Sequence, residues 1–152
     1  MLNARTGAVL GTTRVGFATA LAVDARAGHV LVANASFGTV SLLDTHSGAL
    51  LRTVEVGGSP AAVAVDTRTS RAFVTGSGTL GSIALHHLGK GQLSWAGEWN
   101  NTNIAVLDTR DGTVLGTVPV AAGRGLAMDE RAGRAFATTW DRNTLSTLDA
   151  TQ

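Results

Sequence analysis

Hydrophobic residues occur along the chain in short runs, and glycine, aspartate and serine separate one run from the next. Within many runs Val, Ile and Leu alternate with Thr, Ser or Arg, and others are apolar throughout. Alternation with a period of two is typical of a half-buried strand, and a short continuous apolar run is typical of a strand buried on both faces. The pattern therefore predicts short β-strands joined by tight turns.

The runs recur in the same order three times, which is the signature of a repeat architecture. The first motif reads GAVLGTTRVG from Gly7, GALLRTVEVG from Gly48 and GTVLGTVPVA from Gly112. The second reads ALAVDARAGHVLVANA from Ala20, AVAVDTRTSRAFVTGS from Ala62 and GLAMDERAGRAFATTW from Gly125. The third reads TVSLLDTHSG from Thr39, NIAVLDTRDG from Asn103 and TLSTLDATQ from Thr144. The chain therefore contains three copies of a unit of about 41 residues, the second enlarged by about 23 more.

Each copy predicts four strands, A to D, and A is expected to be innermost. The A strands at 20–23, 62–65 and 125–128 are apolar on both faces, so we expect burial on both sides. A tight turn is expected after each A strand, where an aspartate accepts backbone N–H bonds, at Asp24, Asp66 and Asp129. Hairpins between strands C and D are expected at 44–48 and 108–112. Because these acids recur once per unit, turn capping explains them better than catalysis.

Four antiparallel strands in each unit of this length predict a β-propeller blade. The sequence motifs of the repeats resemble those of the YVTN (YncE-like) family of propeller repeats, a family that is often bacterial. The resemblance rests on RAFVT at 71–75, on the run at 103–120 and on GGSPAAVAVD at 57–66. FVTG at 73–76 and LVAN at 31–34 stand where the family has its YVTN strand. It covers the whole chain except 77–101 and implies an all-β propeller fold.

The ends of the array do not coincide with whole blades. The chain begins with an expected D strand at 7–15 and continues with blades at 17–56 and 60–120, the second interrupted by an insertion at 77–101. The last blade, at 124–149, lacks its outer strand. Three blades are fewer than closed propellers contain. Two alternatives follow: two copies form a six-bladed ring in which each N-terminal strand completes the partner's third blade, or the chain is a piece of a longer propeller.

In a propeller the D–A and B–C loops lie on the same face, usually the one that carries function. The insertion at 77–101 is a B–C loop, and the loops at 121–125 and 139–143 are expected beside it. Candidate binding residues on this loop face are His86, His87, Trp95, Glu98, Trp99, Arg124, Trp140 and Asp141. Aromatic and charged side chains gathered on one face favour recognition of a partner. The alternative is that the inserted Trp residues only pack on the blades. No catalytic residue is assigned.

Two motifs, a glycine-rich sequence and a pair of histidines, point to specific ligands when they are taken alone. GSGTLG, which begins at Gly76, matches the G-x-G-x-x-G dinucleotide fingerprint, and an acid follows at Glu98. That fingerprint requires a βαβ unit, and the surrounding repeat is all-β, so turn chemistry is the better account. His86 and His87 are adjacent, so they point to different sides of an extended chain, and we expect no metal and no cofactor. His29, which replaces an Arg of the other two copies, is expected to be solvated.

Composition excludes several classes of partner and of site. The chain has 152 residues and a net charge of +1, without the clustered cations that a nucleic-acid surface needs. The absence of Cys excludes disulfides, thiolate zinc sites and cysteine nucleophiles. No apolar stretch is long enough to predict a membrane span, and the N-terminus lacks the apolar region of a secretory signal. We expect a cytoplasmic protein if Met1 is its first residue, and an exported one if the chain is a piece of a typical family member.

Three functional hypotheses remain open from the sequence. The first is a non-enzymatic binding or scaffold propeller that presents the loop face to a protein or polymer partner. The second is an enzyme with its site at the propeller mouth, either a metal- or quinone-linked oxidoreductase or a lactonase-like hydrolase; this rests on fold analogy alone. The third is a truncated propeller without independent function. We favour the first, since no ring of convergent acids, His or Arg is visible in the repeats.

Overall fold

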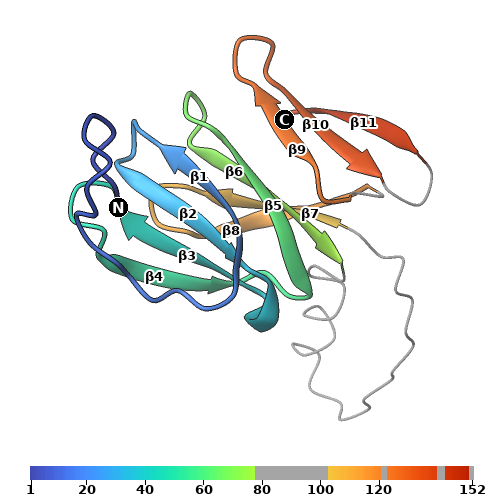
Figure 1. Cartoon of the computed structure of the whole chain (residues 1–152). Helices are drawn as coiled ribbons and strands as arrows, with labels where there is room; N and C mark the ends of the chain where they lie inside the picture. Colours follow the sequence, from blue (N-terminus) through green and yellow to red (C-terminus); the bar gives the residue numbers. More distant parts are fainter. Residues whose placement is uncertain (78–102, 121–122, 140–142, 151–152) are drawn as a thin grey trace.

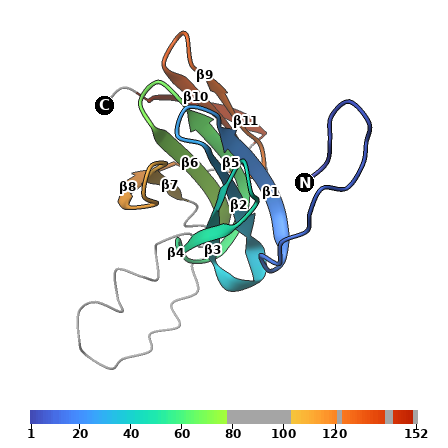
Figure 2. The same ribbon diagram turned by 90° about the vertical axis from the view of Figure 1, so that its left-hand side faces the viewer.

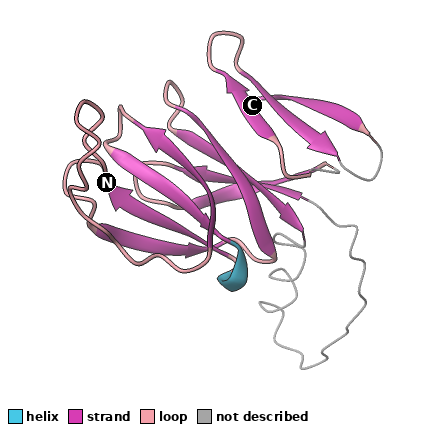
Figure 3. Ribbon diagram, in the orientation of Figure 1, coloured by secondary structure: helices cyan, strands magenta, loops and turns pink. Residues whose placement is uncertain are grey.

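The computed structural model of the chain describes residues 1–77, 103–120, 123–139 and 143–150. In these residues it contains β-strands and one short 3-10 helix, η1 (Ala35–Phe37), and no α-helix (Figure 3). No helix in this part of the chain is long and apolar enough to cross a membrane. The all-β fold predicted from the period-two pattern is therefore confirmed.

The strands form three antiparallel sheets in which neighbours in the chain are neighbours in the sheet (Figure 1). The first sheet contains β1 (Ala18–Asp24), β2 (His29–Asn34), β3 (Thr39–Asp44) and β4 (Leu50–Glu55). The second contains β5 (Ser59–Asp66), β6 (Arg71–Ser77), β7 (Asn103–Asp108) and β8 (Val114–Pro119). The third contains β9 (Leu126–Asp129), β10 (Arg134–Thr139) and β11 (Thr144–Asp149). Each sheet is a simple up-and-down meander.

The sheets stack side by side as consecutive blades of a partial β-propeller. The first strand of each sheet contacts the first strand of the next, β1 with β5 and β5 with β9. The N-terminus lies beside the first sheet, and the third sheet lies at the other end of the row (Figures 1 and 2). The chain thus has two end sheets, each with one face that no other described sheet covers.

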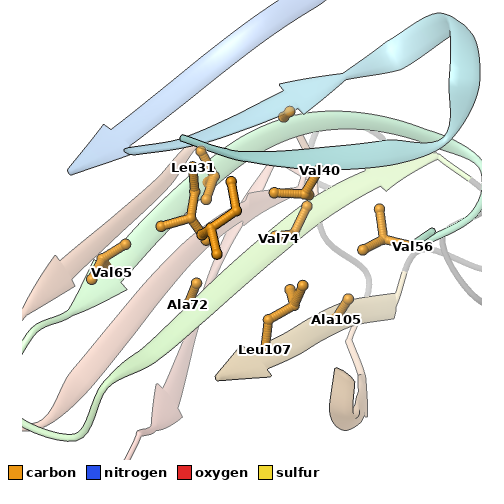
Figure 4. Packing of buried hydrophobic residues seen from close by; sticks show 11 residues of the cluster. Leu31, Val40, Val56, Val65, Ala72, Val74, Ala105 and Leu107 are labelled. Carbon is orange, nitrogen blue, oxygen red and sulfur yellow. The ribbon is translucent and has the colours of Figure 1, made fainter. Parts of the chain in front are cut away.

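Apolar side chains fill the spaces between the sheets, because alternation along each strand sends residues to both faces. Between the first and second sheets, Leu31 and Val40 meet Val65, Val74 and Leu107 (Figure 4). Between the second and third, Phe73 and Ile104 meet residues of the third sheet, namely Ala135, Ala137 and Leu148. The first of these spaces is a thin layer of Val, Leu and Ala, and the second also contains Phe73 and Ile104.

The expectation that every A strand is buried on both faces is confirmed only for the middle sheet. In β5, Val63 and Val65 each expose 8% of their surface. At the corresponding positions of β1, Leu21 exposes 66% and Val23 exposes 50%. The β9 strand is likewise only partly buried. The prediction was wrong for β1 and β9, because no other sheet of the described residues covers the outward faces of the end sheets.

The N-terminal segment does not form the strand expected at 7–15. It makes a single antiparallel bridge between Leu2 and Val9 and then runs along the first sheet, where the Thr13 hydroxyl donates to the Gly48 carbonyl at 2.6 Å. The third sheet contains three strands, so its outer edge at β11 is unpaired within the described chain. A strand cannot form where its ladder partner is absent. Whether this segment completes a third blade in an assembly stays a prediction.

Candidate functional site

The loops expected on one face do lie together at the end of the first sheet. The B–C loop is the η1 turn, and Gly38 directly after it accepts bonds from Val56 N at 2.8 Å and Gly57 N at 2.9 Å, in the following D–A loop. Gly38 has a φ of 61°, and an added Cβ would lie 3.0 Å from the Gly58 oxygen. On the other side, Ala35 N donates to the Phe17 oxygen at 3.0 Å. Backbone bonds therefore join the two loop types into one surface.

Two phenylalanines stand on this surface, and the sequence analysis did not select them. Phe17 exposes 65% of its surface and Phe37 exposes 70%. They flank the same junction, because a Cβ on Gly16, next to Phe17, would lie 3.0 Å from Phe37 Cδ2. The available signal was the repeat itself, since the other copies have serine and alanine at the position of Phe17. Because the equivalent residues of the other two copies are small, the aromatic residue in this copy indicates a role other than packing within the blade.

The predicted binding residues fall mostly outside the described part of the chain. These are His86, His87, Trp95, Glu98, Trp99, Trp140 and Asp141. Arg124 is described, and it is exposed in the D–A loop of the third sheet. Its neighbour Gly123 accepts a 2.8 Å bond from the Thr75 hydroxyl at the loop end of β6. Arg124 thus lies next to a residue that contacts the end of β6, and its role in binding stays a prediction.

The repeated aspartates cap their turns, which confirms the structural interpretation over the catalytic one. Asp24 Oδ1 accepts from Arg26 N at 3.0 Å and from Ala27 N at 2.9 Å. Asp129 Oδ1 accepts from Arg131 N and Ala132 N in the same way. Hydrogen bonds from Ser47 hold the pKa of Asp44 below its ordinary value, and the Arg110 guanidinium does the same for Asp108. These carboxylates are committed to local structure.

His29 is not solvated, so that expectation was wrong. Its ring is partly buried, and Nδ1 lies 2.7 Å from the Thr109 carbonyl oxygen in the second sheet. It sits in register opposite Asp24, whose Oδ2 accepts a 2.5 Å bond from the Thr109 hydroxyl. The side chain therefore joins two blades, a role that its place in a turn does not reveal.

The glycine-rich motif has a packing explanation where it is described. Gly76 belongs to strand β6, and an added Cβ would lie 2.2 Å from the Ser59 oxygen of β5. Gly is therefore required at position 76 by the close approach of two strands. The part of the motif from Gly78 onward lies outside the described residues. Among the described side chains, no group of three or more His, Asp or Glu could hold a metal ion.

Comparisons with known proteins show the fold. No family model and no curated protein matches the sequence. The structure is similar to Kuenenia stuttgartiensis hydrazine synthase, with a TM-score of 0.72 and 20% identity over 97% of this chain and 38% of that one. It is also similar to the β-propeller domain of Cps50 (Swd1) from Myceliophteria thermophila, with a TM-score of 0.63 and 12% identity over 93% and 38% of the two chains. The chain is therefore a partial β-propeller that spans less than half the length of these neighbours.

Proposed function

We propose that this chain is a non-enzymatic binding scaffold, in which the blades are a rigid frame and the loop face recognises a protein partner. The observation that carries the proposal is the pair of exposed aromatic rings at Phe17 and Phe37, placed together by backbone bonds between their loops. Aromatic side chains that are rigidly held and exposed are typical centres of protein interfaces. The inserted residues Trp95, Glu98 and Trp99 and the loop residue Arg124 belong to the same proposed surface.

Several features favour binding over catalysis. The acids that recur in the blades are used in turns, as at Asp24 and Asp44. The loops of the first sheet are held by their own backbone bonds, which suits a preorganised recognition surface. On a separate point, we also propose that these blades are of the YVTN type, which the repeat motifs support.

A peptide selection tests the proposal without a known partner. The probe is a phage-displayed library of random peptides, selected on the immobilised full chain. We expect enriched peptides rich in apolar and aromatic residues whose binding falls at least about tenfold in the Phe17→Ser/Phe37→Ser variant. Leu51→Ser/Leu115→Ser, which changes exposed residues on the outer strands, is the matched control and should bind normally.

Thermal unfolding of each variant is the folding control, and we expect both variants to keep the fold because all four side chains are exposed. The proposal fails if no peptide is enriched, or if the enriched peptides bind the phenylalanine variant as tightly as the wild type. Binding that appears only on an array of polysaccharides would identify a polymer partner and would overturn the choice of a protein.

A further inference from the structure

Two polar contacts join the first sheet to the second at the turn end of their strands. Asp24, the last residue of β1, is fully buried and accepts the Thr109 hydroxyl through Oδ2 at 2.5 Å. His29, the first residue of β2, lies with Nδ1 2.7 Å from the Thr109 carbonyl oxygen. One turn residue of the following blade is thus held by an acid and a nitrogen donor of the preceding blade. We call the pair of bonds that Asp24 and His29 make to Thr109 the Asp–Thr contact.

The same arrangement recurs between the second and third sheets, with one part missing. Arg71, at the position of His29, donates through Nη1 to the Ala150 carbonyl oxygen at 3.2 Å. Asp66, at the position of Asp24, is equally buried. Ala150 stands where the second sheet has Thr109 and brings no hydroxyl, and Asp66 Oδ2 has no hydrogen-bond partner among the described residues. The geometry of the interface is therefore a property of the repeat and not of one pair of blades.

The third sheet carries the aspartate side of a further Asp–Thr contact. Asp129 ends β9 and pairs in register with Arg134, which begins β10, as Asp24 pairs with His29. Both side chains are exposed. Asp129 Oδ1 caps its turn, whereas Oδ2 accepts no hydrogen bond from any residue that the structure describes. This acid and this cation face the side of the third sheet that no other described sheet covers.

The first sheet carries the matching threonine side of the contact. Thr45 stands where the second sheet has Thr109, and both amides donate at 2.9 Å to the carbonyl of the preceding turn, Gly28 or Ser70. The Thr45 hydroxyl, without a carboxylate to meet, donates to the same Gly28 oxygen at 3.0 Å. By strand alternation Thr45 lies on the side of the first sheet opposite Val40, which faces the second sheet. Thr45 therefore faces the other open end.

The N-terminal segment lies where the outer strand of a preceding blade would lie. Between the first and second sheets, Val54 of β4 packs on the turn glycine, so that a Cβ on Gly112 would lie 2.8 Å from Val54 Cγ2. Thr13 has the repeat position of Val54, and it contacts Gly48, the glycine of the first sheet's own turn, by a 2.6 Å hydrogen bond. The segment thus occupies the outer position of a missing blade, directly against the first sheet.

We propose that a second copy of this chain closes the open ends, with the partner's Thr45 seated between Asp129 and Arg134. Asp129 Oδ2 accepts the hydroxyl of the partner's Thr45, and Arg134 donates to its carbonyl oxygen. The occupant is a second copy because one chain carries both complementary halves, each on the correct face. A two-fold axis forms the contact twice and yields six sheets in one ring.

Closure also defines how the N-terminal segment pairs. The β3–β4 and β7–β8 ladders have the same register, with Ser41 opposite Thr53 and Ala105 opposite Thr117. By the repeat, Ser146 of β11 lies opposite Thr12 of the partner. Antiparallel neighbours have Cα atoms about 4.5 to 5.5 Å apart, which is within the range that a disulfide spans.

Cysteine cross-linking tests this register directly, because the chain has no native Cys. Full-length Thr12→Cys and Ser146→Cys chains are mixed and oxidised, and the products are separated without reductant. We expect a disulfide-linked pair in the mixture that neither chain gives alone. The matched control is Leu145→Cys mixed with Thr12→Cys, which is out of register by one residue and should not cross-link, because adjacent side chains face opposite sides of a sheet.

Substitutions of Thr45 and Asp129 provide a second test of the proposed dimer. Thr45→Val and Asp129→Asn should each raise the dimer dissociation constant about a hundredfold, because the ring contains two such contacts and each charge-assisted bond is worth about tenfold. Thr45→Ser keeps the hydroxyl and should bind as the wild type does. Thr109→Val breaks the equivalent contact inside the chain, so it should weaken folding and leave the dissociation constant unchanged.

The outcomes separate this proposal from the loop-face proposal. A chain that is monomeric at all concentrations in light scattering would overturn closure by a second copy. The proposal would also be overturned by a dimer that gives no cross-link and whose dissociation constant is unchanged by Thr45→Val and Asp129→Asn. That result would show that the copies associate through other surfaces. Neither result affects peptide binding through Phe17 and Phe37, which is measured separately.

Discussion

Asp44 and Asp108 show how the blades use acidic side chains at the scale of single residues. Each closes the turn between the third and fourth strands of its sheet. Ser47 donates through its amide and its hydroxyl to Asp44 Oδ1, both at 2.7 Å, and Arg110 Nε donates to Asp108 Oδ1 at 2.9 Å. Because these donors prefer the ionised carboxylate, both pKa values lie below the ordinary value.

These lowered pKa values predict a loss of stability in acid. The stabilisation is fully present above the unfolded-state pKa, about 3.9 for aspartate, and is lost as the pH falls through the lower pKa of the folded state. We expect Asp44→Ala to lower the melting temperature at pH 7, and we expect the difference from wild type to shrink as the pH falls below about 4. Melting curves across this range measure it, and a difference that does not change with pH would contradict the assignment.

Gly76 offers a second residue-scale prediction. An added Cβ would lie 2.2 Å from the Ser59 oxygen and 2.7 Å from Pro60 Cα, both atoms of the backbone. Gly76→Ala must therefore push β5 and β6 apart, at a cost of about 1 to 3 kcal/mol in the free energy of unfolding. Gly116→Ala is the matched control, because a Cβ there meets no atom within 4 Å. Denaturant unfolding of both variants checks the prediction, and equal stabilities would refute it.

At the scale of elements, the Asp–Thr contact explains how neighbouring blades keep their alignment. Thr109→Val keeps the shape of the side chain and leaves Asp24 Oδ2 buried without its donor. We expect the free energy of unfolding to fall by about 2 kcal/mol, since an unpaired buried acceptor of this kind costs that much. Chemical denaturation measures the change, and Thr109→Ser, which restores a hydroxyl, should recover most of it.

The second and third sheets allow the reverse experiment. Asp66 is buried, and its Oδ2 has no partner in the described part of the chain, where Ala150 supplies no hydroxyl. Ala150→Ser adds a donor at the position of Thr109, so we expect the free energy of unfolding to rise by about 1 kcal/mol. Asp66→Asn in the same background should remove the gain. A serine variant less stable than wild type would show that the buried site lacks room for the hydroxyl.

Strands, turns and turn acids were predictable from the sequence because each depends on neighbours along the chain. The period of two identified the strands, and the Asp-x-Arg recurrence identified the caps at Asp24 and Asp129. The bond from Thr109 to Asp24 joins residues 85 positions apart, and nothing local indicates it. The same holds for His29, whose ring bonds across the blades, and for Phe17, which stands out only when the three repeats are compared.

At the scale of the whole molecule, the burial of equivalent residues shows the consequence of having two ends. Ile104 in the middle sheet is fully buried, whereas Leu145, its equivalent in the third sheet, exposes 60% of its surface. Leu21 of the first sheet is exposed on the opposite end. These residues form apolar surfaces of the kind that sheets bury against one another. Assembly of two copies would cover both with the same packing that the chain already uses internally.

The N-terminal segment provides the test of that assembly at the largest scale. Removing residues 1–15 deletes the strand proposed to pair with the partner's β11, while the described sheets keep all of their own ladders. We expect the truncated chain to remain folded and to become monomeric, because an unpaired strand edge and a lost outer strand remove one side of each interface. Light scattering measures the mass, and circular dichroism with thermal unfolding measures the fold. Removing only residues 1–6 leaves the pairing segment intact and should preserve the dimer. A dimer that survives the loss of all fifteen residues would mean that the copies associate without exchanging this strand.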